Sequence, residues 1–214
     1  MKLVKSDVAS LFSVRVFLFR FEDYNKEVLV NTITNMKREI PSEHRSNLGG
    51  WQSPNIFDLD LSEEYKEIIV EFTKILFQGI KQVELLWNFQ PNFAPEISSL
   101  WFNWNEKGNF NVQHSHLGTG YSGAFYIKKR NDPTDGVIEF EDARRDALMW
   151  EVPRTLQHTA APLNGEQFYY HKLYPNEGDL LIFPSYLQHR VLENKSNDVR
   201  ITASFNFNWY NRND

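Results

Sequence analysis

The spacing of apolar residues divides the chain into two parts of different character. Up to about residue 94, apolar side chains recur every three to four residues over two long stretches, which is typical of helices that bury one face. The pattern predicts a first strand over residues 14–21 and helices over residues 23–40 and 62–83. Residues 42–55, between the helices, are rich in Gly, Ser and Asn and predict a loop.

Beyond Pro95 the helical spacing disappears, and short strand-like runs follow one another between turn residues. These runs predict seven strands, over residues 97–105, 110–116, 121–129, 136–142, 168–175, 178–184 and 199–210. Helices followed by strands indicate an α+β protein in which residues 95–214 form a barrel or sandwich. We expect one domain over residues 1–214, with residues 1–94 as its helical part and residues 143–165 as an inserted loop.

Composition agrees with a folded, soluble chain and narrows its partners. Of the 214 residues, 41% are apolar and 15% are aromatic, which is enough to bury a core and too much for a largely disordered chain. The formal net charge is -5 and no stretch is densely basic, so we expect no nucleic-acid partner. The N-terminus lacks the apolar core of a signal peptide, and no apolar run is long enough to span a bilayer. We therefore expect a cytoplasmic protein without a membrane partner.

The chain contains no cysteine. This excludes disulfides, thiolate-bound zinc, iron–sulfur clusters and a cysteine nucleophile. A metal could be bound only by histidine, carboxylate or carbonyl ligands, so histidines at suitable spacing are the first candidates.

His114 and His116 are the strongest local candidates for metal ligands. Residues two apart in a strand point to the same face, so both imidazoles can reach one ion. Phe110 and Val112 fall on the same face of the predicted strand, which we therefore expect to be apolar and to point inward. Two histidines at this spacing also occur by chance on protein surfaces, so the pair alone does not define a site.

A third histidine, His189, follows the apolar strand predicted over residues 178–184. A ligand delivered by a distant strand is the usual way to complete a facial metal site in a β-barrel. The alternative is a histidine that packs at a strand end. If His114, His116 and His189 bind one ion, their nearest ring nitrogens should lie within about 4 Å of one another, since metal–nitrogen bonds are about 2.1 Å.

The last predicted strand alternates apolar residues with polar ones, among them Arg200 and Thr202. Such alternation normally separates a core face from a solvent face. If the polar face instead lines the interior of a barrel, Arg200 is a buried cation that requires an anionic partner. A ligand carboxylate bound through a bidentate pair would supply that partner.

Several short motifs occur in a specific order along the chain. They are Ser46-Asn47 with Trp51 and Ser53, Trp101–Asn105 with Gly108, His114-Ser115-His116, Ser122-Gly123 with Tyr126, the run from Phe183 to His189, and Arg200 with Thr202. Together they resemble the 2-oxoglutarate/Fe(II)-dependent oxygenase superfamily, and within it a branch of oxygenases found in bacteria and phages. The resemblance extends from the first predicted strand to Asn206.

The resemblance implies a double-stranded β-helix (jelly-roll, cupin-like) core with the N-terminal helices packed on one sheet. It also implies Fe(II) and 2-oxoglutarate as cofactors, and a dioxygenase that most simply hydroxylates a substrate with release of succinate and CO2. His114 and His189 match the family's metal-binding histidines, and Arg200 matches the residue that pairs with the distal carboxylate of 2-oxoglutarate. Thr202 and Tyr126 match positions that can donate hydrogen bonds to that cosubstrate.

His116 departs from the family pattern. Most members have Asp or Glu at this position, which gives two histidines and one carboxylate. A third neutral imidazole leaves the iron site one unit more positive. We nevertheless expect His116 to be a ligand, because it shares a face of the predicted strand with His114.

Two other ligand sets are open. In the first, His116-Leu117-Gly118 is an HxG pattern whose small residue leaves a coordination position to halide, and His114 is not a ligand. In the second, a carboxylate from the adjacent strand completes the set, supplied by Glu139, Glu141 or Asp142.

Two other functions are also open. A cupin-type metal dioxygenase or isomerase without 2-oxoglutarate fits the three histidines, but the glutamate expected after them is missing and Arg200 has no role in it. The other is a non-catalytic jelly-roll module that binds a protein or a sugar. For the enzyme we expect a small-molecule or protein side-chain substrate. The oligomeric state is open, and a dimer is compatible with the sequence.

Overall fold

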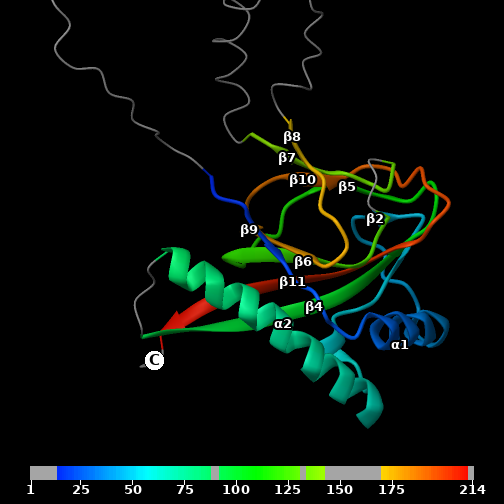
Figure 1. Ribbon diagram of the computed structural model, residues 1–214, viewed down its shortest axis with the longest axis horizontal. Coiled ribbons are helices and arrows are strands. Elements are labelled where there is room, and N and C mark those ends of the chain that lie inside the picture. The colour runs from blue at the N-terminus through cyan, green and yellow to red at the C-terminus, as the bar shows by residue number, and fades with distance from the viewer. Residues whose placement is uncertain (1–13, 88–91, 131–133, 143–169, 212–214) are drawn as a thin grey trace, which may run out of the picture.

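The computed structural model describes residues 14–87, 92–130, 134–142 and 170–211. They form two antiparallel sheets that pack on each other, with the two long helices on one of them (Figure 1). The predicted α+β architecture, with helices first and the sheets built mainly from the second half, is confirmed. Within these residues no helix is both long and apolar enough to cross a membrane.

The helices are α1 (Lys26–Glu39), α2 (Glu63–Trp87) and a short 3-10 helix, η1 (Ile56–Asp58). The six-stranded sheet has the order β1 (Phe17–Arg20), β9 (Asp179–Pro184), β6 (Tyr121–Lys128), β11 (Arg200–Asn211), β4 (Phe93–Asn105) and β3 (Trp51–Gln52). The five-stranded sheet has the order β2 (Asn47–Leu48), β5 (Phe110–His114), β10 (His189–Val191), β7 (Ile138–Glu141) and β8 (Tyr170–Leu173).

The main hydrophobic core lies between the helices and the outer face of the six-stranded sheet. The sheet contributes alternate residues of β11, which are Ile201, Ala203, Phe205 and Phe207. Helix α2 contributes a buried stripe at helical spacing, which is Ile69, Phe72, Leu76, Ile80 and Val83. The helix approaches the sheet closely at Gly79, where an added Cβ would lie 2.2 Å from a methyl group of Leu180. The apolar residues that repeat about every 3.6 positions in α2 and every second position in β11 therefore pack in one core.

The other side chains of β11 point into the space between the two sheets. Part of this space is filled by a smaller apolar cluster, which is Tyr126, Ile138, Phe140, Leu181, Phe183 and Leu187. The rest is a polar pocket lined by Arg200, Thr202 and Ser204 of β11. The alternation of the last strand thus separates a core from a pocket.

The predicted loop over residues 42–55 contains two short strands. β2 pairs with β5 in the small sheet, and β3 pairs with β4 in the large sheet. Strands of two residues carry too little periodicity to be recognised in a sequence. The segment connects both sheets along one side of the molecule.

The structure corrects the expected face of β5. Phe110 and Val112 are 37% and 38% exposed and do not point inward. The pairing of β5 with β10 contains a register shift that places one extra residue in β5, which is a β-bulge. The bulge interrupts the alternation, so Asn111 and His114, three residues apart, line the same pocket. β5 ends at His114, and His116 lies just beyond it.

Residues 143–165, predicted to form an inserted loop, lie outside the described residues.

Candidate functional site

Three histidines meet between the sheets. The candidate ligand nitrogens of His114, His116 and His189 all lie within 4.8 Å of one another. The ring centroid of His114 is 4.3 Å from that of His189 and 5.0 Å from that of His116. The structure therefore brings the three predicted residues together. Two metal–nitrogen bonds of about 2.1 Å hold the nitrogens within roughly 4 Å of each other, so coordination requires at most a small inward movement of the rings.

Backbone contacts position these rings. His189 begins β10 directly opposite His114 of β5, so the pairing of two neighbouring strands sets the distance between them. The backbone N–H of His116 donates to the carbonyl of Ser185 at 2.9 Å. This bond ties the segment after β5 to the turn after β9. Main-chain contacts thus fix the positions of all three histidines.

Hydrogen bonds orient two of the imidazoles. The Nδ1 atom of His114 lies 2.7 Å from the carbonyl oxygen of Val112, and that of His189 lies 2.9 Å from the carbonyl oxygen of Leu187. A protonated Nδ1 donates to each carbonyl, which leaves Nε2 as the free ligand atom. The arrangement selects the same tautomer at both residues.

Burial keeps all three imidazoles neutral at neutral pH. It lowers the pKa of His114 below its ordinary value. It lowers the pKa of His116 to about 4 and that of His189 to about 3, and repulsion from His114 adds to the effect at both. Because a metal binds the neutral ring, no proton has to be displaced at these residues around pH 7.

Within the described residues, the candidate carboxylate ligands lie elsewhere. The three histidines form a cluster that includes no acidic residue. Glu139 is buried in ion pairs with Arg190 at 2.6 Å and Lys172 at 3.2 Å. Glu141 accepts a hydrogen bond from Gln113. The HxG alternative, which removes His114 from the ligand set, is at odds with the position of that ring: its centroid lies 5.0 Å from that of His116 and 4.3 Å from that of His189, closer than the 5.3 Å between the latter two.

Arg200 lies in the same pocket as the histidines and is only 1% exposed. Its Nη1 and Nη2 atoms have no hydrogen-bond partner in the described part of the chain. Burial lowers the pKa of Arg200, yet a guanidinium remains charged in proteins. A buried cation with two unsatisfied donor atoms facing a pocket is suited to an anionic ligand.

Thr202 and Tyr126 line this pocket as well. They are directly opposite each other in the β6–β11 ladder. Burial raises the pKa of Tyr126, so its phenol stays protonated and can donate a hydrogen bond. The hydroxyl of Thr202 accepts a hydrogen bond from the amide of Asn103 at 3.4 Å. All six residues expected to bind the metal or the cosubstrate thus line one pocket.

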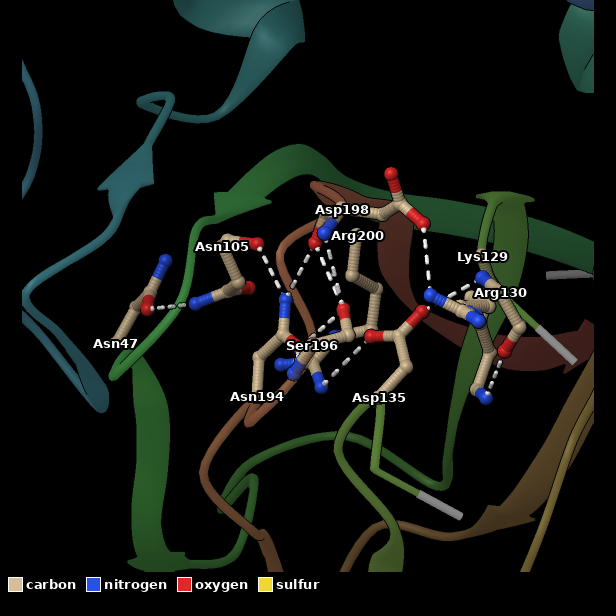
Figure 2. A network of polar contacts seen from close by, with 9 residues as sticks. All are labelled: Asn47, Asn105, Lys129, Arg130, Asp135, Asn194, Ser196, Asp198 and Arg200. Atoms are coloured by element: carbon tan, nitrogen blue, oxygen red, sulfur yellow. Dashed lines mark hydrogen bonds and ion pairs between the residues drawn. The ribbon is translucent and has the colours of Figure 1, made fainter. Parts of the chain in front are cut away.

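A polar network surrounds Arg200 at the start of β11 (Figure 2). Asp135, which is fully buried, lies beside the guanidinium with its Oδ1 atom 3.9 Å from Nη1. Its other oxygen accepts the backbone N–H of Arg130 at 2.7 Å. The Asn194 amide donates to the carbonyl of Asn105 at 3.2 Å, which anchors the loop before β11 to β4.

Gly136 leaves the space that the guanidinium occupies. Its φ is 54°, and an added Cβ would lie 1.5 Å from Nη1 of Arg200. A side chain here would force the guanidinium to move, and the left-handed backbone conformation also disfavours one. The guanidinium of Arg200 can therefore occupy this position only because residue 136 is a glycine.

Sequence reasoning did not assign a role to Asp135, Asn194 or Gly136. None of them belongs to a spacing pattern that indicates chemistry, and their relation to Arg200 arises from the isolated bridge between Asp135 and Asn194. Trp101 and Asn103 belonged to a motif of the resemblance, and both prove to line the pocket.

The fold defines a class of protein. HygX from Streptomyces hygroscopicus with nickel, 2-oxoglutarate and hygromycin B bound is similar over 91% of this chain and 83% of its own, with a TM-score of 0.61 and 11% identity. A Pseudomonas putida prolyl-4-hydroxylase is similar over 94% of this chain and 95% of its own, with a TM-score of 0.57 and 15% identity. The non-haem α-ketoglutarate-dependent carbocyclase SnoK from nogalamycin biosynthesis is similar over 91% and 79%, with a TM-score of 0.59 and 10% identity. The jelly-roll fold expected from the resemblance is confirmed.

A family model identifies the chain more closely. Residues 99–206, which are 108 of the 214 residues, match the family described as "Putative 2OG-Fe(II) oxygenase". The chain belongs to this family of 2-oxoglutarate- and iron-dependent oxygenases, and the expected family membership is confirmed. No curated protein matches the chain by sequence.

Proposed function

We propose that the protein is an Fe(II)- and 2-oxoglutarate-dependent dioxygenase that hydroxylates an organic substrate. His114, His116 and His189 would bind the iron, and Arg200, with Thr202 and Tyr126, would bind the distal carboxylate of 2-oxoglutarate. When bound, these two groups would supply, with dioxygen as the oxidant, decarboxylation of 2-oxoglutarate to succinate and CO2 coupled to hydroxylation of a substrate C–H bond. The observation that carries the proposal is the unsatisfied guanidinium of Arg200 in the pocket of the three histidines.

The residues of the chain fit both groups. Three neutral imidazoles with free nitrogens are a suitable donor set for a divalent iron. The two Nη atoms of Arg200 provide the fork that a carboxylate accepts in bidentate fashion. Because the sheets enclose this end of the pocket, water competes little for the guanidinium. HygX with nickel and 2-oxoglutarate bound supports the assignment through its shared fold.

An anaerobic titration of the protein with Fe(II), with and without 2-oxoglutarate, tests the proposal. We expect a weak visible charge-transfer band only when both are present, and oxygen-dependent formation of succinate. Arg200→Ala should lose the 2-oxoglutarate-dependent band and succinate formation while keeping most Fe(II) binding, because it removes the anion-binding group and no metal ligand. Arg38→Ala, at an exposed position of α1, is the matched control and should behave as the wild type. Succinate formation at the wild-type rate in Arg200→Ala would refute the cosubstrate assignment.

The role of His116 is tested separately. His116→Ala should lose iron, because two imidazoles remain. His116→Asp should keep or raise the affinity for Fe(II), provided that the shorter side chain reaches the metal, because a carboxylate adds a negative charge to the ligand set. Iron content and 2-oxoglutarate decarboxylation are measured for both variants. Full activity of His116→Ala would exclude the three-histidine site and favour an acidic ligand from elsewhere.

The cupin-type function without 2-oxoglutarate is a distinct outcome of the same experiments. It leaves the two buried Nη atoms of Arg200 without a hydrogen-bond acceptor in the described part of the chain. A protein that binds Fe(II) through the histidines but gives no response to 2-oxoglutarate would favour this alternative.

A further inference from the structure

A second cavity lies beside His114 and His116. It has a volume of about 460 Å³ and shares Trp101, His114 and His116 with the pocket of Arg200. This volume lies in the range of roughly 300–1,000 Å³ that is usual for small-molecule sites. Asn206 lines it, six residues along β11 from Arg200, which is roughly 20 Å at 3.3 Å per residue. The second cavity, here called the outer groove, therefore extends away from Arg200.

The residues that line the outer groove are polar or charged, apart from Trp101. They include no aliphatic side chain, and hydroxyl and amide groups predominate, among them those of Gln52, Ser99, Ser115 and Asn206. A lipid or an aliphatic side chain would find no aliphatic side chain to pack against here. A ligand that forms many hydrogen bonds matches such a lining.

Gln52 is the group that most clearly requires a ligand. It is 4% exposed, lines the outer groove, and its Oε1 atom has no hydrogen-bond partner within the described residues. A buried amide without a partner is costly, and an amide offers one acceptor and one donor group side by side. A ligand hydroxyl group that donates to Oε1 would satisfy the unpaired atom.

The charges of the outer groove disfavour an anionic ligand. Arg45 donates to Glu43 at 2.6 Å, so its positive charge is compensated. Asp58 accepts a hydrogen bond from Asn55 at 3.0 Å and adds a negative charge. The three charged residues of the lining therefore sum to one negative charge, which favours a neutral or cationic ligand.

Trp101 provides a flat apolar surface where the outer groove meets the histidines. Its ring centroid is 5.6 Å from that of His116. An aromatic face combined with surrounding hydrogen-bond partners suits a ring that has apolar C–H faces and a polar edge. We propose that the outer groove binds a sugar or amino-sugar unit beside His116, with its hydroxyl groups on Gln52. This inference rests on the proposed function, because it assigns the substrate class of the same site.

Direct binding measurements test the inference. Wild-type protein loaded with Fe(II) and 2-oxoglutarate under nitrogen is titrated with a β-1,4-linked glucosamine trimer, maltotriose, a galacturonic acid trimer and the peptide Ala-Pro-Ala. We expect the glucosamine trimer to bind about threefold or more tightly than maltotriose, as one added exposed ion pair allows, and the acidic trimer not to bind. In air, the glucosamine trimer should stimulate succinate formation.

A matched pair of variants tests the contact itself. Gln52→Leu should weaken binding of the glucosamine trimer about tenfold, as expected for the loss of one or two hydrogen bonds. Gln78→Leu makes the same change at an exposed position of α2 and should bind the trimer as the wild type does. Circular dichroism verifies that both variants are folded.

Three outcomes would overturn the inference. The first is that neither the neutral sugar nor the amino sugar binds at about 10 mM, which is ten times a weak Kd of about 1 mM. The second is that the acidic trimer or the peptide binds more tightly than both sugars. The third is that the wild type and Gln52→Leu bind the sugars with equal affinity. The charge-transfer band of the wild type with Fe(II) and 2-oxoglutarate distinguishes a failure of the substrate class from a failure of the proposed function. If the band forms and the sugars fail, only the substrate class is wrong; if the band does not form, the proposed function fails first.

Discussion

Strand β11 contributes side chains to both faces of the six-stranded sheet, and the two faces differ in what those side chains contact. On β11, Ala203 and Phe205 are fully buried against the helices, whereas Arg200 and Thr202, which precede them, are buried against a pocket. On the outer face, apolar side chains of the sheet pack on apolar side chains of the helices, so the protein itself supplies every contact that they need. On the inner face, some buried donor and acceptor atoms have no hydrogen-bond partner within the described residues.

The unsatisfied atoms all belong to the inner face or the site next to it. Within the described residues, Gln52, Asn103 and Arg200 have buried side-chain atoms without a hydrogen-bond partner. Natural proteins leave few such atoms, and each calls for an explanation. Here Asn103 and Arg200 line the pocket of the three histidines, and Gln52 lines the adjoining outer groove. Substitutions on the outer face should therefore change stability, and those on the inner face should change ligand binding.

The largest effect is expected from the outer face. Phe205→Ala should lower the free energy of unfolding by about 3–5 kcal/mol, because it opens a cavity in the core under α2. The neighbouring backbone cannot relax easily, since the ring already lies against Gly123, where an added Cβ would be 2.4 Å from it. Urea denaturation measures the change.

Val70→Ala, at a residue of α2 that is 56% exposed, is the control and should change stability by less than about 1 kcal/mol. Below the unfolding transition, the affinity of the folded Phe205→Ala variant for 2-oxoglutarate should match that of the wild type. A loss of affinity without a loss of stability would contradict the separation of the two faces.

The second effect concerns the position of Arg200. Gly136→Ala should weaken 2-oxoglutarate binding at least tenfold, because the new methyl group would occupy the place of Nη1. Gly108→Ala is a matched control, since Gly108 also has a positive φ, of 88°, but no atom lies within 4 Å of its added Cβ. Both variants carry the backbone strain of about 1–2 kcal/mol, and only the first displaces the guanidinium.

Calorimetric titration with 2-oxoglutarate in the presence of a divalent metal measures the difference. Equal affinities in the two glycine variants would show that Arg200 does not contact the cosubstrate, or that it moves without consequence. Either result would remove the main argument for the inner face as an anion site.

The sequence predicted the outer face better than the inner one. The stripe of α2 and the alternation of β11 follow from the periods of helix and strand, and both proved correct. The same alternation could not distinguish a pocket from solvent, since Arg200 and Thr202 are polar in either case. That distinction depends on the second sheet, which is built from residues distant in the sequence.

The histidines illustrate a second limit. Their identity was accessible, because few other residues could bind a metal in a chain without cysteine. The local geometry was not, because the bulge in β5 turns Phe110 and Val112 outward and the strand ends before His116. The bulge is set by pairing with β10, and Gly136 likewise acquires its role only through contact with Arg200. Non-local pairing therefore determined what the local pattern could not.

The smallest effect is expected from Tyr126→Phe, which keeps the ring and removes only the hydroxyl group. Tyr126 lines the pocket of Arg200 and is 2% exposed. Loss of one hydrogen bond of about 0.5–1.4 kcal/mol would weaken 2-oxoglutarate binding about two- to tenfold. Calorimetric titration at pH 7 detects this change, and the free energy of unfolding at that pH should differ from that of the wild type by less than about 1 kcal/mol.

The same variant has a defined effect in alkaline solution. Burial raises the pKa of Tyr126 in the folded protein above the value of about 10 that it has when unfolded. A raised folded-state pKa gives stability that is complete below the unfolded pKa and is lost as the pH rises above it, because only the unfolded chain can then release the proton. Wild-type stability should therefore fall more steeply above pH 10 than that of Tyr126→Phe, by about 1.4 kcal/mol per pH unit. Urea denaturation at about pH 7 and 11 measures the two slopes, and identical slopes would mean that the phenol of Tyr126 reaches solvent and is not a buried donor of the inner face.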